Sequence, residues 1–536
     1  MRVSIVVAVC MAAAAARAPA QAPVGASTRE LVAVNSDVER YLRVLQDIGL
    51  VPAYPWSVRE FGPREIQSLI PATTSHPWAD RVRSTQYQNV DWYFLAPQAL
   101  ATYNSTFPSG DNDGALWQGR GLTAALQGGV AGHIGRLSLT LDPIVFWAQN
   151  QSFPLAANGQ TGALRFADGV NPTTIDQPQR FGNSAYARFD PGQSTIRLDL
   201  PVIAIGASTA NQEWGPAIDN PIILGNNAAG FPHLFVGSSA PVDLWLVRAQ
   251  GRVEWGRLDQ SPYAVLRGTQ SRRFMSGIVG SVSPRGLSNL EIGGARFFHT
   301  LWPDSGLTRH DFLRPFEGLL LSSVANEIGN GTGQEPDNQL ASIFVRWVFP
   351  RSGLELYSEF GREDHNADLR DFTQEPDHDA AYVIGLQKAW VRRDSTYYVL
   401  HGEVVNSRIS HLQLGRPQTV FYVHSPVVQG HTEEGQILGS PSVYGGGGFS
   451  FALDRYTRDG RWTVAWEKSA RAESIGADGL PDGRQADVVH SVSIERVHSG
   501  RRAIVTGGIT LSDDLNRNFA ADKGNVRLEL SVIPRW

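Results

Sequence analysis

Apolar and polar residues alternate strictly in many short segments of this chain, and this alternation constrains the fold more than any other feature. Clear examples are 137–141, 196–200, 354–357 and 526–532, where apolar residues take every second position. Successive side chains of a β-strand point to opposite faces, so each segment predicts a strand with one apolar and one polar face. Because the pattern recurs from about Trp92 to the C-terminus, we expect a large all-β structure.

Two kinds of all-β architecture produce such alternation. A soluble sandwich or propeller hides the apolar face in a core, whereas a transmembrane barrel turns it to lipid and its polar face to a wet lumen. Long connections of unequal length, at 149–183, 326–339 and 471–484, and a last strand that ends on Trp536 favour the barrel. The polar faces also carry full charges, as a charged lumen would: Arg136, Asp142, Arg197, Asp199, Glu355 and Glu359.

The N-terminus has the order of a secretory signal peptide. Arg2 precedes an uncharged apolar run, and Ala18 and Ala20 form a small-residue cleavage motif before Gln21. The run is too short to cross ~30 Å of hydrocarbon as a helix, so we expect residues 1–20 to be cleaved after export. Cys10 is the only cysteine, and its removal leaves no thiol for a disulfide, a zinc site or a nucleophile.

Residues 21–85 have a helical pattern, unlike the rest of the chain. Apolar residues recur at helical spacing from Val38 to Ile48, after a possible capping box that starts at Ser36. Pro63 can open a second short helix, which we expect to pack on the first or on the end of the barrel. The remaining segment, 86–536, has room for about 18 to 22 antiparallel strands at roughly 20 to 25 residues per strand and connection.

Composition and motifs argue against several classes of function. The formal charge is −5 without a basic patch, so no nucleic-acid partner is expected. The chain has no HExxH motif, no G-x-S-x-G nucleophile elbow, and no phosphate loop at its glycine run 445–448. Its histidines lack the spacing of metal ligands. We therefore expect no cofactor, no metal and no enzymatic activity, although a Ser-His-Asp set of distant residues stays open.

The stretch from Glu213 to Phe231 concentrates side chains that suit sugars. Aromatic rings can cover the C–H faces of sugars, while amides and guanidinium groups pair with hydroxyls and carboxylates. Two interpretations without sugar binding stay open. Asn226 and Asn227 can simply close a turn, and Trp214 and Trp255 can belong to an aromatic girdle at the membrane interface. The candidate carbohydrate-binding residues are Trp214, Asn220, Asn226, Asn227, Phe231, Arg248, Glu254 and Trp255.

Four stretches in chain order resemble the capsule assembly Wzi family of outer-membrane barrels. They are 103–121 with Tyr-Asn-Ser, Asn-Asp-Gly and Gln-Gly-Arg-Gly; 214–228 with Trp-Gly-Pro and Asn-Pro-Ile-Ile-Leu-Gly-Asn-Asn-Ala; 355–378 with Glu-Leu-Tyr-Ser-Glu and Glu-Pro-Asp-His; and 424–439 with Gln-Gly-His-Thr and Gly-Gln-Ile-Leu-Gly. The chain departs from the family pattern at Glu213, at Ala217 and at Glu433-Glu434.

The resemblance implies an all-β transmembrane barrel of about 18 antiparallel strands, with a small N-terminal helical segment on the periplasmic side. It places the protein in the outer membrane of a Gram-negative-type bacterium. It also implies a lectin-like, non-enzymatic role in attaching capsular or other extracellular polysaccharide to the cell surface. The partners would be that polysaccharide, outer-membrane lipid and, during biogenesis, the barrel assembly machinery.

A substrate-selective porin and an outer-membrane hydrolase remain as alternatives. Long connections that fold inward would favour polysaccharide binding over a porin, because a plugged barrel cannot conduct. Apolar residues of 149–183, such as Phe153 and Phe166, gain nothing from exposure and are expected to fold against the barrel mouth.

One strand face carries Glu355, Tyr357 and Glu359, which we expect to line the lumen. These residues either bind sugar hydroxyls or pair with lumenal arginines, and the second interpretation is favoured. Arg248 and Arg252 are the partners that the sequence suggests, since arginine suits bidentate pairs with carboxylates.

Overall fold

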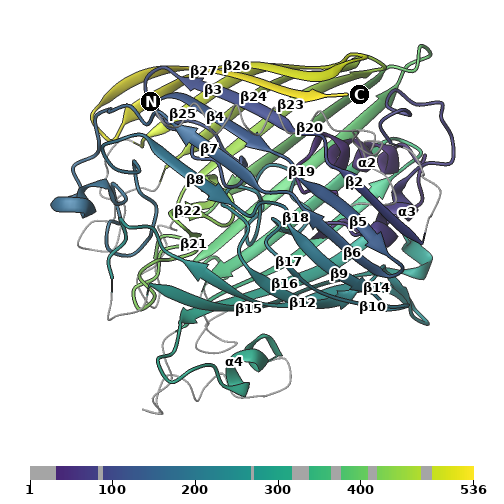
Figure 1. Cartoon of the computed structure of the whole chain (residues 1–536), viewed down its shortest axis with the longest axis horizontal. Helices are drawn as coiled ribbons and strands as arrows, with labels where there is room; N and C mark the ends of the chain where they lie inside the picture. The colour runs from purple at the N-terminus through teal and green to yellow at the C-terminus, as the bar shows by residue number, and fades with distance from the viewer. Residues whose placement is uncertain are drawn as a thin grey trace.

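The computed structural model describes residues 32–82, 89–266, 271–316, 337–363, 376–408, 419–471 and 486–535. The expected signal peptide, most of the connections 326–339 and 471–484, and Trp536 lie outside these residues. Mostly antiparallel strands surround a small helical part at the N-terminus (Figure 1). Among the described residues, no helix is both long enough and apolar enough to span a bilayer.

Two N-terminal helices occupy the positions that the sequence predicts. Helix α2 (Asp37–Asp47) begins after Ser36, whose hydroxyl accepts a hydrogen bond from the Glu39 amide at 3.3 Å. Helix α3 (Pro63–Leu69) has its proline in the first turn, where no backbone donor is lost. Both helices contribute to one apolar cluster that also contains residues of the barrel wall, as expected; it includes Leu42, Ile66 and Tyr456.

Neighbouring strands of the main sheet pair antiparallel, and most of them also follow one another in the chain; β2 instead pairs with β5, β4 with β7 and β6 with β9. The last strand pairs with β3, Leu528 lying opposite Tyr103, and this pairing closes the sheet into a barrel. The strands are β2 (Val90–Phe94), β3 (Gln98–Asn104), β4 (Gly121–Gln127), β5 (Val130–Ile134), β6 (Leu137–Leu141), β7 (Ile144–Ala148), β8 (Tyr186–Asp190), β9 (Thr195–Asp199), β10 (Ile203–Ser208), β12 (His233–Ser238), β13 (Val242–Asp243), β14 (Val247–Asp259), β15 (Arg272–Pro284), β16 (Leu290–Leu301), β17 (Asp337–Phe349), β18 (Leu354–Glu363), β19 (Ala380–Val391), β20 (Tyr397–Asn406), β23 (Gly447–Thr457), β24 (Gly460–Ala470), β25 (Val488–Ser499), β26 (Ala503–Arg517) and β27 (Ala521–Pro534).

Apolar side chains cover the outside of the barrel, as the alternation predicts. On β27, Val526, Leu528 and Leu530 are exposed, whereas the residues between them face the lumen. Exposed aromatic residues gather near both ends of the strands, which is the arrangement of the interfacial girdles of membrane barrels. One group comprises Trp245, Trp347, Trp390 and Trp462, and the other Tyr103, Trp147, Phe189 and Tyr382.

The two ends of the barrel differ in the length of their connections. Short turns such as 350–353 and 458–459 join strands at the end where α2 and α3 lie. There, the indole nitrogen of Trp78 donates to the carbonyl of Thr457 at 3.2 Å. The long connections, including 149–185, gather at the opposite end (Figure 1). As expected, Phe153 and Phe166 of that connection are buried.

We predict that arginine is tolerated on one face of β25 and not on the other. Ile494 lies near the middle of the strand and points outward, whereas its neighbour Ser493 points to the lumen. Ile494→Arg should destabilise the barrel by about 2–4 kcal/mol, because its charge would face hydrocarbon. Ser493→Arg, at the same depth, should cost much less. Unfolding in lipid vesicles measures the change in the free energy of unfolding for each variant. Equal changes in the two variants would contradict a lipid-facing outer surface.

Candidate functional site: a filled lumen

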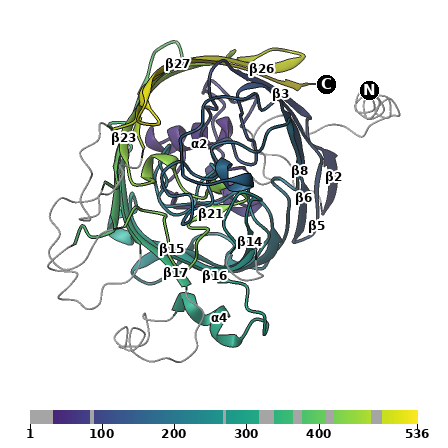
Figure 2. The same cartoon turned by 90° about the vertical axis from the view of Figure 1, so that its left-hand side faces the viewer.

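Two long connections turn back into the barrel and fill its interior. We call them the plug: residues 209–232, between β10 and β12, and residues 419–446, between β20 and β23. The plug contains the short strands β11 (Glu213–Trp214), β21 (Thr432–Glu433) and β22 (Gln436–Ile437). The view along the barrel shows β21 and helix α2 inside the ring of strands (Figure 2).

An apolar cluster joins the plug to one wall of the barrel. From the plug come Trp214, Ile222 and Tyr422, each essentially without exposed surface. The ring of Trp214 meets that of Phe297, on β16, edge-on at 6.0 Å between centroids. Close packing of this kind leaves little free volume, so the plug is part of the barrel's core and does not hang loosely in its opening.

The N-terminal segment reaches the plug from the other end of the barrel. Its strand β1 (Val58–Arg59) pairs antiparallel with β11, Val58 lying opposite Trp214. Arg59 forms ion pairs with Glu39 of α2 at 3.0 Å and with Glu213 of the plug at 2.9 Å. The helices and the plug therefore form one body that crosses the lumen.

Glu355, on the lumenal face of β18, holds this body to the barrel wall. One carboxylate oxygen accepts from Arg43 of α2, and the other accepts from Arg346 of β17 at 2.6 Å. All three side chains are almost completely buried. The expected pairing of Glu355 with lumenal arginine is confirmed, but the suggested partners were wrong: Arg248 pairs with Asp243, and Arg252 lies 3.6 Å from Glu254.

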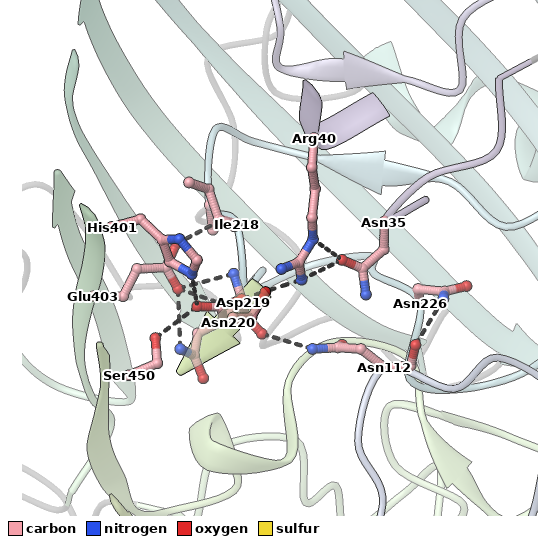
Figure 3. Close-up of polar contacts among 12 residues, drawn as sticks. Asn35, Arg40, Asn112, Ile218, Asp219, Asn220, Asn226, His401, Glu403 and Ser450 are labelled. Atoms are coloured by element: carbon pink, nitrogen blue, oxygen red, sulfur yellow. Dashed lines mark hydrogen bonds and ion pairs between the residues drawn. The ribbon is translucent and has the colours of Figure 1, made fainter. Parts of the chain in front are cut away.

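A second polar cluster surrounds Asp219, in the plug (Figure 3). Its carboxylate lies 3.3 Å from Arg40 of α2 and 3.3 Å from His401 of β20. It also accepts a hydrogen bond from the Ser450 hydroxyl at 2.8 Å. One charged side chain thus connects the helices, the plug and two strands. Burial alone would raise the pKa of Asp219, but the charges of His401 and Arg40 hold that pKa below its usual value.

Glu403, two residues beyond His401 on the same face of β20, holds the turn that carries Asp219. Its carboxylate accepts the backbone amides of Ile218 at 2.5 Å, Asp219 at 3.1 Å and Asn220 at 2.8 Å. It also accepts from the Asn220 side chain at 3.0 Å. Such a carboxylate satisfies backbone donors that would otherwise be buried without a partner.

The cavity beside this cluster is very small. It measures about 10 Å³ and is lined by Arg40, Arg43, Ile218 and His401, among others. That volume holds about one water molecule and excludes a sugar ring. Among the described residues, no group of three or more His, Cys, Asp or Glu side chains is placed to hold a metal ion. This cluster therefore has no room for a sugar and connects the segments that fill the lumen.

Five of the eight candidate carbohydrate-binding residues lie in the plug. The Asn220 side chain also accepts from Ser440 at 2.9 Å, Asn226 donates to the carbonyl of Asn112 at 2.8 Å, and Asn227 donates to that of Ile437 at 2.8 Å. Trp214 and Phe231 are buried in the apolar cluster, so the girdle interpretation of Trp214 is wrong. Binding of a glycan by these residues stays a prediction, and the buried ones would be reached only if the plug moved.

The other three candidates lie on β14 and do not share one location. Arg248 is near the short-turn end and pairs with exposed Asp243 at 3.0 Å. Glu254 faces the lumen and accepts from Gln212 of the plug at 2.7 Å. Trp255 points outward, as the girdle interpretation requires, and its indole nitrogen donates to the carbonyl of Phe312 at 2.9 Å. Phe312 belongs to helix α4 (Arg309–Leu313), which lies outside the ring of strands in Figure 2.

The residues that sequence reasoning missed are those that meet across the lumen. Arg40, Asp219, His401 and Glu403 had no motif to mark them. The only local signal was that His401 and Glu403 share the lumenal face of one alternating strand.

A match to a protein-family model shows which family the chain belongs to. The model of the family described as capsule assembly protein Wzi matches residues 118–456. The chain belongs to this family. Membership of this family and the apolar outer surface of the barrel both indicate an outer-membrane β-barrel. No curated protein sequence matches the chain.

One solved structure supports this fold. The Escherichia coli outer membrane protein Wzi, described as involved in group 1 capsule assembly and as a carbohydrate-binding β-barrel, matches with a TM-score of 0.62 at 12% identity. The match covers 94% of this chain and 99% of that one. OccK5 of Pseudomonas aeruginosa matches with a TM-score of 0.40 at 10% identity, covering 84% of this chain and 99% of that one, which is too weak to carry an argument.

One departure of this Wzi-family chain from the expected pattern has a structural role. Glu213 stands where the resemblance leads us to expect an aromatic residue before Trp214. Here the Glu213 carboxylate forms an ion pair with Arg59, which connects the plug to the N-terminal segment.

We predict that Glu355→Gln loosens the N-terminal helices. The substitution leaves Arg43 and Arg346 buried without a full counter-charge, which should lower the free energy of unfolding by about 3–5 kcal/mol. Denaturant unfolding in detergent measures the loss. The matched control is Asp243→Asn, which removes the exposed partner of Arg248 and should leave the unfolding midpoint nearly unchanged. Similar shifts in both variants would contradict the assigned role.

The contribution of Asp219 should disappear in acid. Because the folded pKa lies below the unfolded value, its stabilisation is complete above the pKa of an unfolded aspartate, ~3.9, and is lost as the pH falls through the folded pKa. The stability difference between the native chain and Asp219→Asn should therefore be large at about pH 6 and shrink below about pH 4. A difference that grows on acidification would contradict an ionised Asp219 at the centre of this cluster.

Proposed function

We propose that this protein binds capsular or other extracellular polysaccharide at the outer membrane and helps attach or assemble it at the cell surface, without catalysing a reaction. The observation that carries this proposal is the filled lumen. The plug and the N-terminal helices occupy the space through which a porin would conduct, and buried ion pairs hold them there.

Family membership supports the role in capsule assembly. The Escherichia coli Wzi protein, which shares the fold along 94% of this chain, is described as carbohydrate-binding. That description concerns a protein of 12% identity, so glycan binding by the present chain rests on the proposal. The identity of the glycan is a separate question, treated below.

The two alternatives have less support. A substrate-selective porin needs an open path, whereas the plug fills the lumen and the cavity beside Asp219 holds about one water molecule. A hydrolase needs a nucleophile and base in contact beside room for a substrate. The buried polar cluster around Asp219 has no such room, and its carboxylates are occupied by backbone amides and arginine.

The proposal includes an orientation. Short turns of outer-membrane barrels face the periplasm and long connections face outward, so α2 and α3 lie on the periplasmic side. Residues 1–20 are then a cleaved signal peptide, 21–85 the periplasmic helical segment and 86–536 the barrel. If strands that continue in line across a short break, such as β2 and β3, count as one, the described residues form about 18 strands. Outer-membrane lipid surrounds them, and the barrel assembly machinery inserts them.

Conductance and capsule retention test the proposal together. Purified protein in planar bilayers should show little or no steady conductance, whereas a variant with residues 211–230 replaced by a short Gly-Ser linker should conduct. A strain lacking the protein should release capsule that its parent retains at the surface. Large, reproducible steps from the intact protein would favour the porin. Shortened glycan in the presence of the protein would favour the hydrolase.

A further inference from the structure

The connection 149–185 carries an aromatic cluster at the end of the barrel opposite α2 and α3, in the blue part of Figure 1. Phe181 stacks on Tyr186 at 4.6 Å between ring centroids and meets Tyr263 edge-on at 6.0 Å. Phe166, in the short helical turn η2 (Gly162–Phe166), meets Tyr263 at 5.5 Å. The two phenylalanines are buried, while the two tyrosines keep part of their surface exposed. We call these four rings the aromatic platform.

Two arginines lie beside this platform, and neither forms an ion pair with a carboxylate of the described residues. The Arg165 guanidinium lies over the ring of Phe166, 4.7 Å from its centroid, and the side chain is exposed. Arg180 is 5% exposed and donates through Nη2 to the carbonyls of Asn150 at 2.6 Å and Asn183 at 3.3 Å. Its Nε atom is buried and has no hydrogen-bond partner among the described residues.

The two positive charges affect one another. Burial, and then the nearby charge of Arg165, lower the pKa of Arg180. Two cations held close together without a counter-ion are costly, and an anion placed between them relieves the cost. Arg188, on the neighbouring strand, is different, because it contacts both Asp190 and Glu434 and is already neutralised. Among these three arginines, only Arg165 and Arg180 therefore lack a carboxylate partner within the described part of the chain.

We propose that Arg165 and Arg180, with the partly exposed rings of Tyr186 and Tyr263 beside them, form a subsite for a carboxylate-bearing sugar, so that the bound polysaccharide is acidic. A guanidinium group pairs with a carboxylate through two parallel hydrogen bonds, and an aromatic ring covers the apolar face of a sugar. The inference rests on the proposed function, because it assumes that polysaccharide reaches the end of the barrel that carries the long connections. It assigns binding to residues other than those of the plug.

Binding of defined oligosaccharides tests this subsite. Oligogalacturonate serves as the carboxylate-bearing probe and dextran of equal length as the neutral one, both titrated against the full chain in detergent. The native protein should bind oligogalacturonate, more weakly as salt rises, and should bind dextran much less. Arg165→Gln should weaken oligogalacturonate binding about tenfold or more, and Arg165→Glu should abolish it.

The matched control is Arg501→Gln, which removes an exposed arginine from the short turn after β25, at the other end of the barrel. Its affinity for oligogalacturonate should equal that of the native protein. Because Arg165 is exposed, its variants should keep the heat-modifiable mobility of the folded barrel on gels. Arg180→Gln tests the buried partner and should also weaken binding.

Three results would overturn the subsite: equal affinity of Arg165→Gln and Arg501→Gln, equal affinity of the native protein for both probes, or no binding of oligogalacturonate. None of these results touches the capsule-retention experiment. A strain that lacks the protein yet retains its capsule would instead contradict the proposed function.

Discussion

Buried contacts between arginine and carboxylate side chains are the interaction on which the closed barrel depends. Glu355 joins Arg43 of α2 to Arg346 of the wall, and Arg59 joins α2 to the plug. A buried charge is tolerated only with its partner in place, so removal of one segment would leave charges uncompensated on the others. The helices, the plug and the wall are consequently stable as a unit, and this mutual dependence keeps the lumen filled.

Under the proposed function, this arrangement places the residues that close the lumen and the residues that bind a ligand in different parts of the barrel. In the interior, the carboxylates of Asp219 and Glu403 are occupied by protein partners. We therefore propose that ligand binding takes place at the end of the barrel that carries the long connections. In the proposed subsite, Arg165 and Arg180 lie there without a carboxylate partner among the described residues, beside the rings of Phe166 and Tyr263.

The candidate site was only partly predictable from the sequence. The lumenal face of Glu355, Tyr357 and Glu359 and the burial of Phe166 followed from alternation and from the cost of exposing apolar groups. The chemistry of Trp214 and Asn220 suits sugars, yet the same atoms here fill the plug and cap its turns. The chemistry of a side chain limits which ligands it can bind. The packing of neighbouring residues determines whether a ligand can reach it.

The sequence by itself determined the strands, their inward and outward faces and the two N-terminal helices, because each depends on spacing between residues that are near in the chain. Only the tertiary structure decided which charges meet. Arg43 and Glu355 are 312 residues apart, and Arg40 and Asp219 are 179 apart. No local pattern relates such positions. The curvature of the closed sheet and the path of the plug bring them together, and these arise from the packing of the whole chain.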